Sequence, residues 1–196
     1  MIVLFEEPRR EDGLGVPYPA MPENENFGFI YLKKNREQIP NVREIAERPE
    51  LIAFVQAICA ESSMFQTLRC GEFRHYERGP EFDIPVAEWY VTIAFDVLYY
   101  NTMGAFREFS EQFLTFLEQY PENERTLLFI KPIYTSFNDH GGWTGVTLDF
   151  CFRSYATTSA EAERQLFGMV KPVTEFLSHE SSLWLNKLDP KLERIC

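Results

Sequence analysis

Hydrophobic positions change their spacing along the chain, and this change separates helical from extended segments. Within residues 49–58 the apolar side chains recur with the spacing of one helix face, namely Leu51, Phe54, Val55 and Ile58. Pro49 suits the first turn of this helix, because its missing N–H would have no partner there. Upstream, Asn41-Val-Arg-Glu44 has the form of a capping box, which predicts that helix begins near residue 41.

From about residue 67 the apolar positions alternate, which predicts strands. Strands over residues 67–78 and 88–101 are expected to pair as a hairpin across a loop with Gly79, Pro80 and Pro85. One face of the second strand is expected in the core and carries Trp89, Val91, Ile93, Phe95 and Val97. The opposite face carries Tyr90, Thr92, Ala94, Asp96, Leu98 and Tyr100.

A second run of elements follows with the same order. A helix is predicted over residues 103–120, where Pro121 stops it. Strands over residues 125–137 and 143–155 are joined by the glycine-bearing segment Asn138-Asp-His-Gly-Gly142. The last helix opens at a second capping-box pattern, Thr158-Ser-Ala-Glu161, and runs to about residue 178, with Pro172 expected to kink or divide it.

Residues 67–120 and 125–178 therefore both have the order strand, strand, helix. With a shift of 55 positions (147 − 92 = 55), Thr92 aligns with Thr147 and Phe95 with Phe150. An internal repeat explains these matches, and so does the general likeness of two amphipathic hairpin–helix units. Both interpretations predict an α+β fold, in which an antiparallel sheet of at least four strands carries the two helices on the face that holds Phe95 and Phe150.

The 196 residues suit a single α+β domain over 1–196. Prolines and glycines in residues 6–26 favour extended or turn structure, so we expect an N-terminal arm over 1–26. A short strand at 27–33 and the first helix would occupy 27–66, the two strand–strand–helix units 67–178, and a tail 179–196.

Composition narrows the classes of function. Nineteen basic and thirty acidic side chains give a formal charge of −11, which repels phosphate backbones and anionic lipid. We therefore expect a basic protein partner and no direct binding to nucleic acid or membrane, although the acidity equally well serves solubility. The N-terminus has no signal-peptide pattern, no apolar run approaches the length of a membrane span, and the four cysteines lack C-x-x-C spacing. These features predict a cytoplasmic protein.

Motifs for catalysis or cofactor binding are missing from the sequence. It contains no G-x-G-x-x-G, no Walker lysine loop and no G-x-S-x-G elbow, and His75, His140 and His179 have no ligand-like neighbours. We therefore predict no cofactor, no metal and no enzymatic activity. Two alternatives stay open: His75 has a catalytic or pH-sensing role, or Asp96 and Asp149 form a carboxylate pair in place of an ion pair with Arg153.

The second face of the sheet is the predicted partner-binding site. Its predicted contact residues are Tyr90, Asp96, Tyr100, Trp143, Asp149, Arg153 and Tyr155. Aromatic rings supply contact area at low entropic cost, and charged groups fix the register of a complex. The competing interpretation is that the tail, with Leu183, Trp184, Leu185 and Leu188, folds back and buries this face.

Three features of the sequence carry a resemblance to a known class of proteins. They are the acidic loops at residues 77–83 and 118–124, the aromatic sheet face and the segment Asn138-Asp-His-Gly-Gly-Trp143. Over residues 27–178 the chain resembles, in general style, the immunity proteins that bacteria encode beside polymorphic toxins. The resemblance implies stoichiometric inhibition of a basic toxin domain, and it assigns no role to an individual residue. The alternatives are a module that binds small cationic molecules on the aromatic, acidic face, and an enzyme without a recognisable motif.

Overall fold

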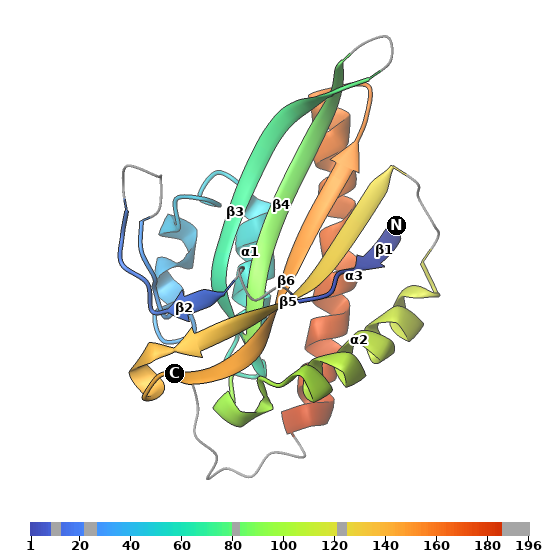
Figure 1. The fold of residues 1–196 in the computed structure, drawn as a ribbon. Coiled ribbons are helices and arrows are strands. Elements are labelled where there is room, and N and C mark those ends of the chain that lie inside the picture. Colours follow the sequence, from blue (N-terminus) through green and yellow to red (C-terminus); the bar gives the residue numbers. More distant parts are fainter. Residues whose placement is uncertain (9–12, 22–26, 80–82, 121–124, 186–196) are drawn as a thin grey trace.

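A mixed sheet of six strands is the centre of the computed structural model (Figure 1). The structure describes residues 1–8, 13–21, 27–79, 83–120 and 125–185, with side chains as far as residue 180. The strands are β1 (Ile2–Phe5), β2 (Leu14–Val16), β3 (Phe65–Arg78), β4 (Asp83–Phe95), β5 (Thr126–Phe137) and β6 (Trp143–Tyr155). Their order is β1-β5-β6-β4-β3, and β2 also pairs with β5.

The pairing confirms the α+β class and corrects the sheet type. The pairs β3–β4, β4–β6 and β6–β5 are antiparallel, whereas β1 and β2 both lie parallel to β5. The expected arm therefore contributes two short strands to the sheet. The cause is the free edge of β5, whose backbone groups pair with whatever extended segment lies beside them.

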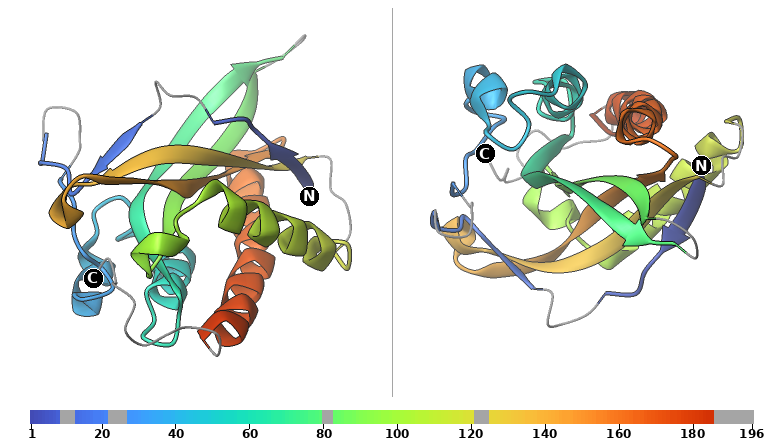
Figure 2. Two further views of the ribbon diagram at one scale, coloured as in Figure 1. Left: turned by 60° about the horizontal axis from the view of Figure 1, so that its bottom comes forward. Right: turned by 90° about the horizontal axis from the view of Figure 1, so that it is seen from above.

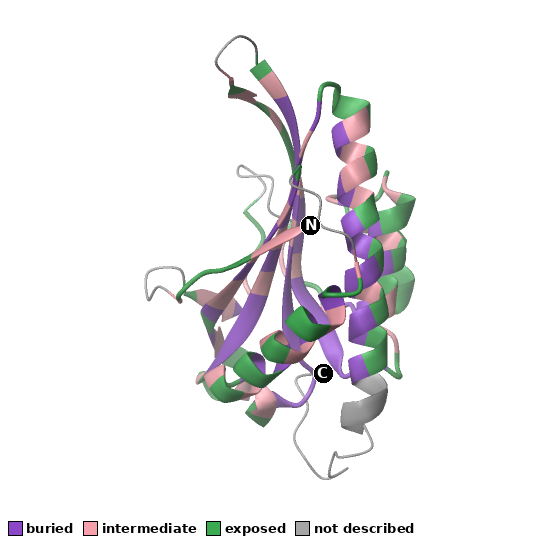
Figure 3. Cartoon of the chain, turned by 90° about the vertical axis from the view of Figure 1, so that its right-hand side faces the viewer, coloured by how far each residue is buried: buried purple, intermediate pink, exposed green. Residues whose placement is uncertain are grey.

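Three α-helices cover one face of this sheet: α1 (Pro49–Ile58), α2 (Met103–Leu117) and α3 (Ser159–Leu185). The 3₁₀ helices η3 (Arg36–Asn41), η4 (Leu98–Tyr100) and η5 (Asn138–His140) lie between the longer elements. Figure 2 shows α1 and α3 on the same side of the strands, and Figure 3 shows the buried side of α3 turned toward the sheet. We call this side of the sheet the helix face.

Aromatic rings fill the space between the helix face and the helices. Phe95 and Phe150 are fully buried, which confirms the core face predicted from the alternation. The Phe95 ring lies 4.6 Å from the ring of Phe106 in α2. Phe109 of α2 contacts Phe150 at 6.4 Å and Phe176 of α3 at 5.2 Å, so one set of rings joins both helices to the sheet.

The N-terminal segment covers one end of the opposite face, which we call the open face. A second, smaller apolar cluster forms there from Val16, Leu68, Ala94, Leu98 and Phe137, flanked by Leu14, Tyr18, Phe29, Tyr31 and Trp143. Residues 14–18 and 29–31 thus bury part of the surface that we expected to be uncovered. The tail that we considered as a cover, with Leu183, Trp184, Leu185 and Leu188, lies outside the described side chains.

Two local predictions are wrong, and so is the predicted division of the last helix. Residues 27–33 form no strand, because the chain turns there toward η3. Asn41 is the last residue of η3 and caps nothing; α1 begins only at Pro49, whose ring fixes the first helical φ. Pro172 lies inside α3 without dividing it. The capping pattern at Thr158 is confirmed, since its hydroxyl accepts a hydrogen bond from the Glu161 amide at 3.3 Å.

Strand β4 ends six residues earlier than predicted (101 − 95 = 6), at Phe95. Asn101 causes this ending. Its buried side-chain amide accepts from the Phe95 N–H at 2.9 Å and donates to the carbonyls of Phe95, Val97 and Leu98. These bonds satisfy the backbone of a tight turn in place of a strand ladder, so η4 follows.

Truncation of Phe95 tests this account of the core. We expect Phe95→Ala to lower the free energy of unfolding by about 3–5 kcal/mol, because it leaves a cavity where rings of β3, β4 and α2 meet. Urea unfolding followed by circular dichroism measures the change, with Tyr99→Ala at an exposed ring as the control. A loss below about 1 kcal/mol would contradict the assigned core.

Candidate functional site

Five of the predicted contact residues share the open face: Trp143 lies in the apolar cluster at one end, and the other four lie on β4 and β6 beyond it. Strands β4 and β6 are direct neighbours, and their register places Thr92 opposite Asp149 and Tyr90 opposite Cys151. Arg153 and Tyr155 follow on the same face of β6, because side chains two residues apart point to the same side. The sequence therefore predicted correctly that Tyr90, Asp149, Arg153 and Tyr155 lie on one surface.

Most charges on this surface are already paired within the chain. The Thr92 hydroxyl donates to Asp149 at 2.5 Å, and an Arg69 nitrogen lies 3.5 Å from the same carboxylate. Arg153 contacts Glu88 at 2.5 Å and Glu77 at 3.4 Å. The expected ion pair between Asp149 and Arg153 is therefore wrong, since Arg69 is the arginine that contacts Asp149.

Asp96 and Tyr100 lie away from the open face, because β4 ends before them. The Asp96 side chain is buried and lies 3.1 Å from the ammonium of Lys33. Tyr100 packs on the helix side, with its ring 6.4 Å from the ring of Phe95. Neither residue contributes to a surface site, and the hypothetical carboxylate pair of Asp96 with Asp149 is excluded.

Trp143 is a packing residue of the second apolar cluster. Its ring lies 5.7 Å from Phe137 and 6.1 Å from Tyr99. The indole also crosses Gly145, where an added Cβ would stand 2.3 Å from it. Trp143 is therefore a half-buried residue of the open face that packs in the second apolar cluster.

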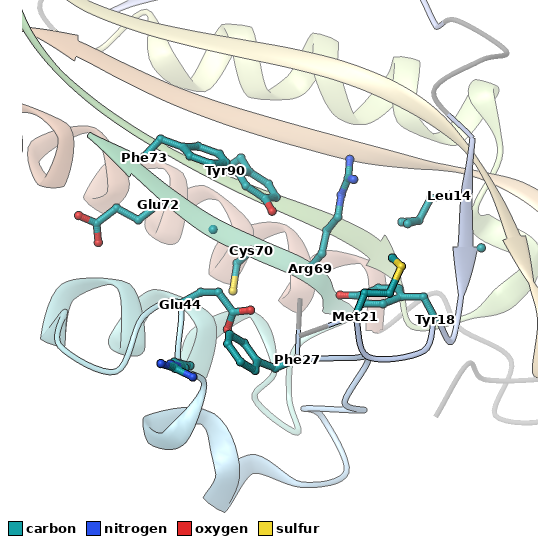
Figure 4. Close-up of a pocket in the computed structure, with 13 residues that line it drawn as sticks. Leu14, Tyr18, Met21, Phe27, Glu44, Arg69, Cys70, Glu72, Phe73 and Tyr90 are labelled. Carbon is teal, nitrogen blue, oxygen red and sulfur yellow. The ribbon is translucent and has the colours of Figure 1, made fainter. Parts of the chain in front are cut away.

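A large hollow lies beside these residues, along the outer edge of β3 (Figure 4). Its volume is about 960 Å³. Residues 69–73 of β3 line one side, and the other side is formed by Tyr18, Met21, Phe27, Arg43 and Glu44. A smaller hollow of about 310 Å³ adjoins it at residues 67–70. We call the two hollows together the edge groove.

One wall of the edge groove is a layered set of planar groups. The rings of Phe73 and Tyr90 are stacked at 5.7 Å with an interplanar angle of 17°. On its other side Tyr90 carries the Arg69 guanidinium, 5.7 Å from the ring centroid. Gly71 makes the arrangement possible, because a Cβ at this position would lie 2.5 Å from the Tyr90 ring.

The other wall carries the carboxylate of Glu44. This side chain is half-buried and, among the described residues, takes part in no ion pair. Burial raises the pKa of Tyr18 to about 12 and that of Cys70 to about 12, and the negative charge of Glu44 adds to both increases. Burial also raises the pKa of Tyr90, which Arg69 partly opposes. These groups stay neutral at pH 7, so the carboxylates of the larger hollow are those of Glu44 and Glu72.

Exposed apolar side chains gather around the edge groove. Met21, Phe27 and Phe73 line the larger hollow with exposures of 41%, 39% and 53%, and Ile30 lines the smaller one with 37%. Contiguous apolar surface of this kind marks interaction sites, because water contact with it is unfavourable. The edge groove is therefore the best candidate binding site on the described surface.

Candidate chemistry elsewhere is weak. His75 is half-buried on β3, and its Nε2 lies 3.7 Å from Glu77, beyond hydrogen-bond distance. In the part of the chain that the structure describes, no group of three or more His, Cys, Asp or Glu side chains could hold a metal ion. Nor is any helix of the described residues long and apolar enough to cross a bilayer.

The sequence indicated Tyr90 but missed Glu44, Arg69, Gly71 and Phe73. Gly71 was the available signal, since a glycine inside a strand often marks the close approach of another group. Comparison of the chain with protein-family models, with curated proteins and with solved structures finds no match. The surface chemistry of the edge groove is thus the basis for assigning a function.

A double-mutant cycle tests the wall of the groove. Gly71→Ala should destabilise the protein by about 1–3 kcal/mol, because the new methyl group displaces the Tyr90 ring. In a Tyr90→Ala background the same change should cost almost nothing, since the space is then free. Equal losses of unfolding free energy in both backgrounds would show that Tyr90 does not lie over Gly71.

The buried ion pair gives a second test. Asp96→Ala should cost about 3–5 kcal/mol, because it leaves the Lys33 ammonium without its carboxylate in a buried position. Glu61→Ala removes one partner of the exposed pair with Arg36 and should cost less than about 1 kcal/mol. Thermal and urea unfolding compare the two variants, and similar losses would contradict the buried role of Asp96.

Proposed function

We propose that this protein is an acidic binding protein that neutralises a basic protein partner by forming a stoichiometric complex with it. The observation that supports the proposal is the edge groove, where exposed Met21, Phe27 and Phe73 surround the unpaired Glu44. Exposed apolar side chains supply contact area in protein interfaces, and a charged group beside them favours a partner of opposite charge.

The net negative charge of the chain indicates that the partner is positively charged. A formal charge of −11 attracts a basic surface over distances longer than a contact and repels other acidic proteins. The resemblance to bacterial immunity proteins agrees with this assignment, and it implies that the partner is a basic toxin domain. In this proposal the protein is not an enzyme, needs no cofactor and acts in the cytoplasm, where free thiols such as Cys59, Cys70 and Cys151 persist.

A small cationic ligand is the second candidate, and the size of the groove favours it. Hollows of about 960 and 310 Å³ fall within the range of ligand pockets, about 300–1,000 Å³. Glu44 beside the rings of Phe27 and Tyr18 offers both an ion pair and cation–π contacts to an ammonium group. Native mass spectrometry of the protein purified from its host distinguishes the two candidates, since a retained small molecule adds a defined mass.

Reconstitution tests the first candidate. Proteins captured from the host on the immobilised chain are purified, and each is titrated with the chain while its own activity is measured. We expect one basic protein to form a 1:1 complex and to lose its activity at equimolar ratio. If every captured protein is acidic, or keeps full activity in the complex, the inhibitor function is wrong.

The association rate gives an independent prediction. It should fall by about tenfold or more between 0.01 and 0.1 M salt, because the Debye length shrinks from about 30 to about 10 Å and screens the attraction. Stopped-flow fluorescence with the reconstituted partner measures the rate. A rate that does not change with salt would indicate a neutral, shape-driven contact.

A further inference from the structure

We propose that the edge groove binds an extended segment of the basic partner, which adds as a further strand to the outer edge of β3 and places a Lys or Arg side chain against Glu44. The inference rests on the proposed function, because it describes how that function's partner is held. It follows from the backbone of β3, the alternation of its side chains and the charge of the groove.

The backbone of β3 provides the template. β3 is the last strand of the sheet on its side, so alternate residues direct N–H and C=O groups away from β4. Residues 67–73 line the groove. Beyond the register shift between Thr67 and Arg69, residues 69–73 present a regular strand edge of roughly 15 Å, at about 3.4 Å per residue. No strand of the described residues pairs with this edge.

Side chains of the protein itself cap the edge only at its beginning. The Tyr18 hydroxyl donates to the Leu68 carbonyl at 3.3 Å, and the Lys33 ammonium donates to the carbonyls of Ser63 at 2.5 Å and Phe65 at 3.3 Å. From residue 69 to residue 73, no side chain of the described residues bonds to the backbone of β3. The capped part ends where the larger hollow begins.

The two sides of the groove select different side chains. Figure 4 shows Arg69, Phe73 and Tyr90 on one side of the β3 ribbon and Cys70 on the other, together with Glu44. A strand added beside β3 alternates in the same way. One set of its side chains therefore meets the stacked rings of Phe73 and Tyr90, while the other set meets the Glu44 carboxylate.

Charge decides which residue meets Glu44. The nearby Glu72 carboxylate is already held by Arg48 at 2.9 Å and by Arg74 at 2.7 Å. The exposed Arg43 lies over the Phe27 ring at 4.6 Å, at the rim of the hollow. Among the carboxylates that line the groove, Glu44 is thus the one without an ion pair to the described residues, and a Lys or Arg of the incoming strand supplies its partner.

An extended segment also satisfies groups that a small cation leaves unpaired. A free amine would reach Glu44 and the rings, but the outward N–H and C=O groups of residues 69–73 would keep only water as partners. A strand provides backbone partners along the whole groove, as in other complexes formed by strand addition. The elongated shape of the groove therefore favours a peptide.

Backbone methylation tests the strand pairing. The probe is the fluorescein-labelled peptide acetyl-Val-Lys-Val-Lys-Val-Lys-Val-amide, whose affinity for the full chain is measured by fluorescence anisotropy. Methylation of every backbone nitrogen keeps the charge of the lysines but removes all backbone N–H donors. We expect this change to weaken binding at least about tenfold. Methylation restricted to the Val or to the Lys nitrogens blocks one edge, so at least one of these two peptides should retain binding within about threefold.

Paired protein variants test the charge. Glu44→Gln should weaken binding of the parent peptide at least about tenfold, whereas Glu108→Gln, an exposed carboxylate on α2, should change it less than about twofold. Both variants remove one negative charge, so a general electrostatic effect would weaken peptide binding equally in the two variants. Circular dichroism confirms that each variant is folded.

Each outcome decides one question. The inference is overturned if the fully methylated peptide binds as well as the parent, if the two Gln variants behave alike, or if no binding is detected at about 1 mM peptide. A partner that is inhibited at 1:1 ratio despite such a result would leave the proposed function standing with a different contact surface. Peptide binding as expected, with no basic protein inhibited, would support the groove and refute the inhibitor function.

Discussion

The ring of Phe109 is the contact on which the arrangement of layers depends. It touches rings of Phe65 in β3, Phe95 in β4, Phe150 in β6 and Phe176 in α3, so α2 serves as a bridge between the sheet and the last helix. Because aromatic packing of this density is sensitive to position, the helices are confined to one face. The open face and the two sheet edges are then left to the N-terminal segment and to partners.

The two edges of the sheet are treated differently. The β5 edge is closed by β1 and β2, which occupy its backbone groups at residues 127–130 and 135–137. No strand of the described residues closes the β3 edge, and its outer half is dense in charge, with Arg74, Glu77 and Arg78. Charged side chains on an edge discourage uncontrolled strand pairing. The charged residues of the inner half, Arg69 and Glu72, are paired within the chain, and this half lies within the groove.

The alternation of apolar residues predicted the α+β class, the positions of β3 to β6 and the burial of Phe95 and Phe150, because burial on one face forces a period of two. It did not predict where β4 ends, since the buried amide of Asn101 overrides the pattern. Asp96 and Tyr100 were misplaced for this reason, and the pattern did not show that residues 14–18 and 29–31 cover part of the open face. The edge groove was missed because it combines segments that are distant in sequence, and a strand pattern does not reveal which strand lies at an edge.

The pairing of β1 with β5 has a consequence for the order of folding. Ile2 lies opposite Leu127, so this contact spans 125 residues (127 − 2 = 125). Closing so long a loop is entropically costly, and it becomes favourable only after β5 has already been held by β6. During synthesis the first strand therefore waits for almost two thirds of the chain to follow it. Until β1 and β2 pair with β5, its edge is open, and an open strand edge can pair with another chain.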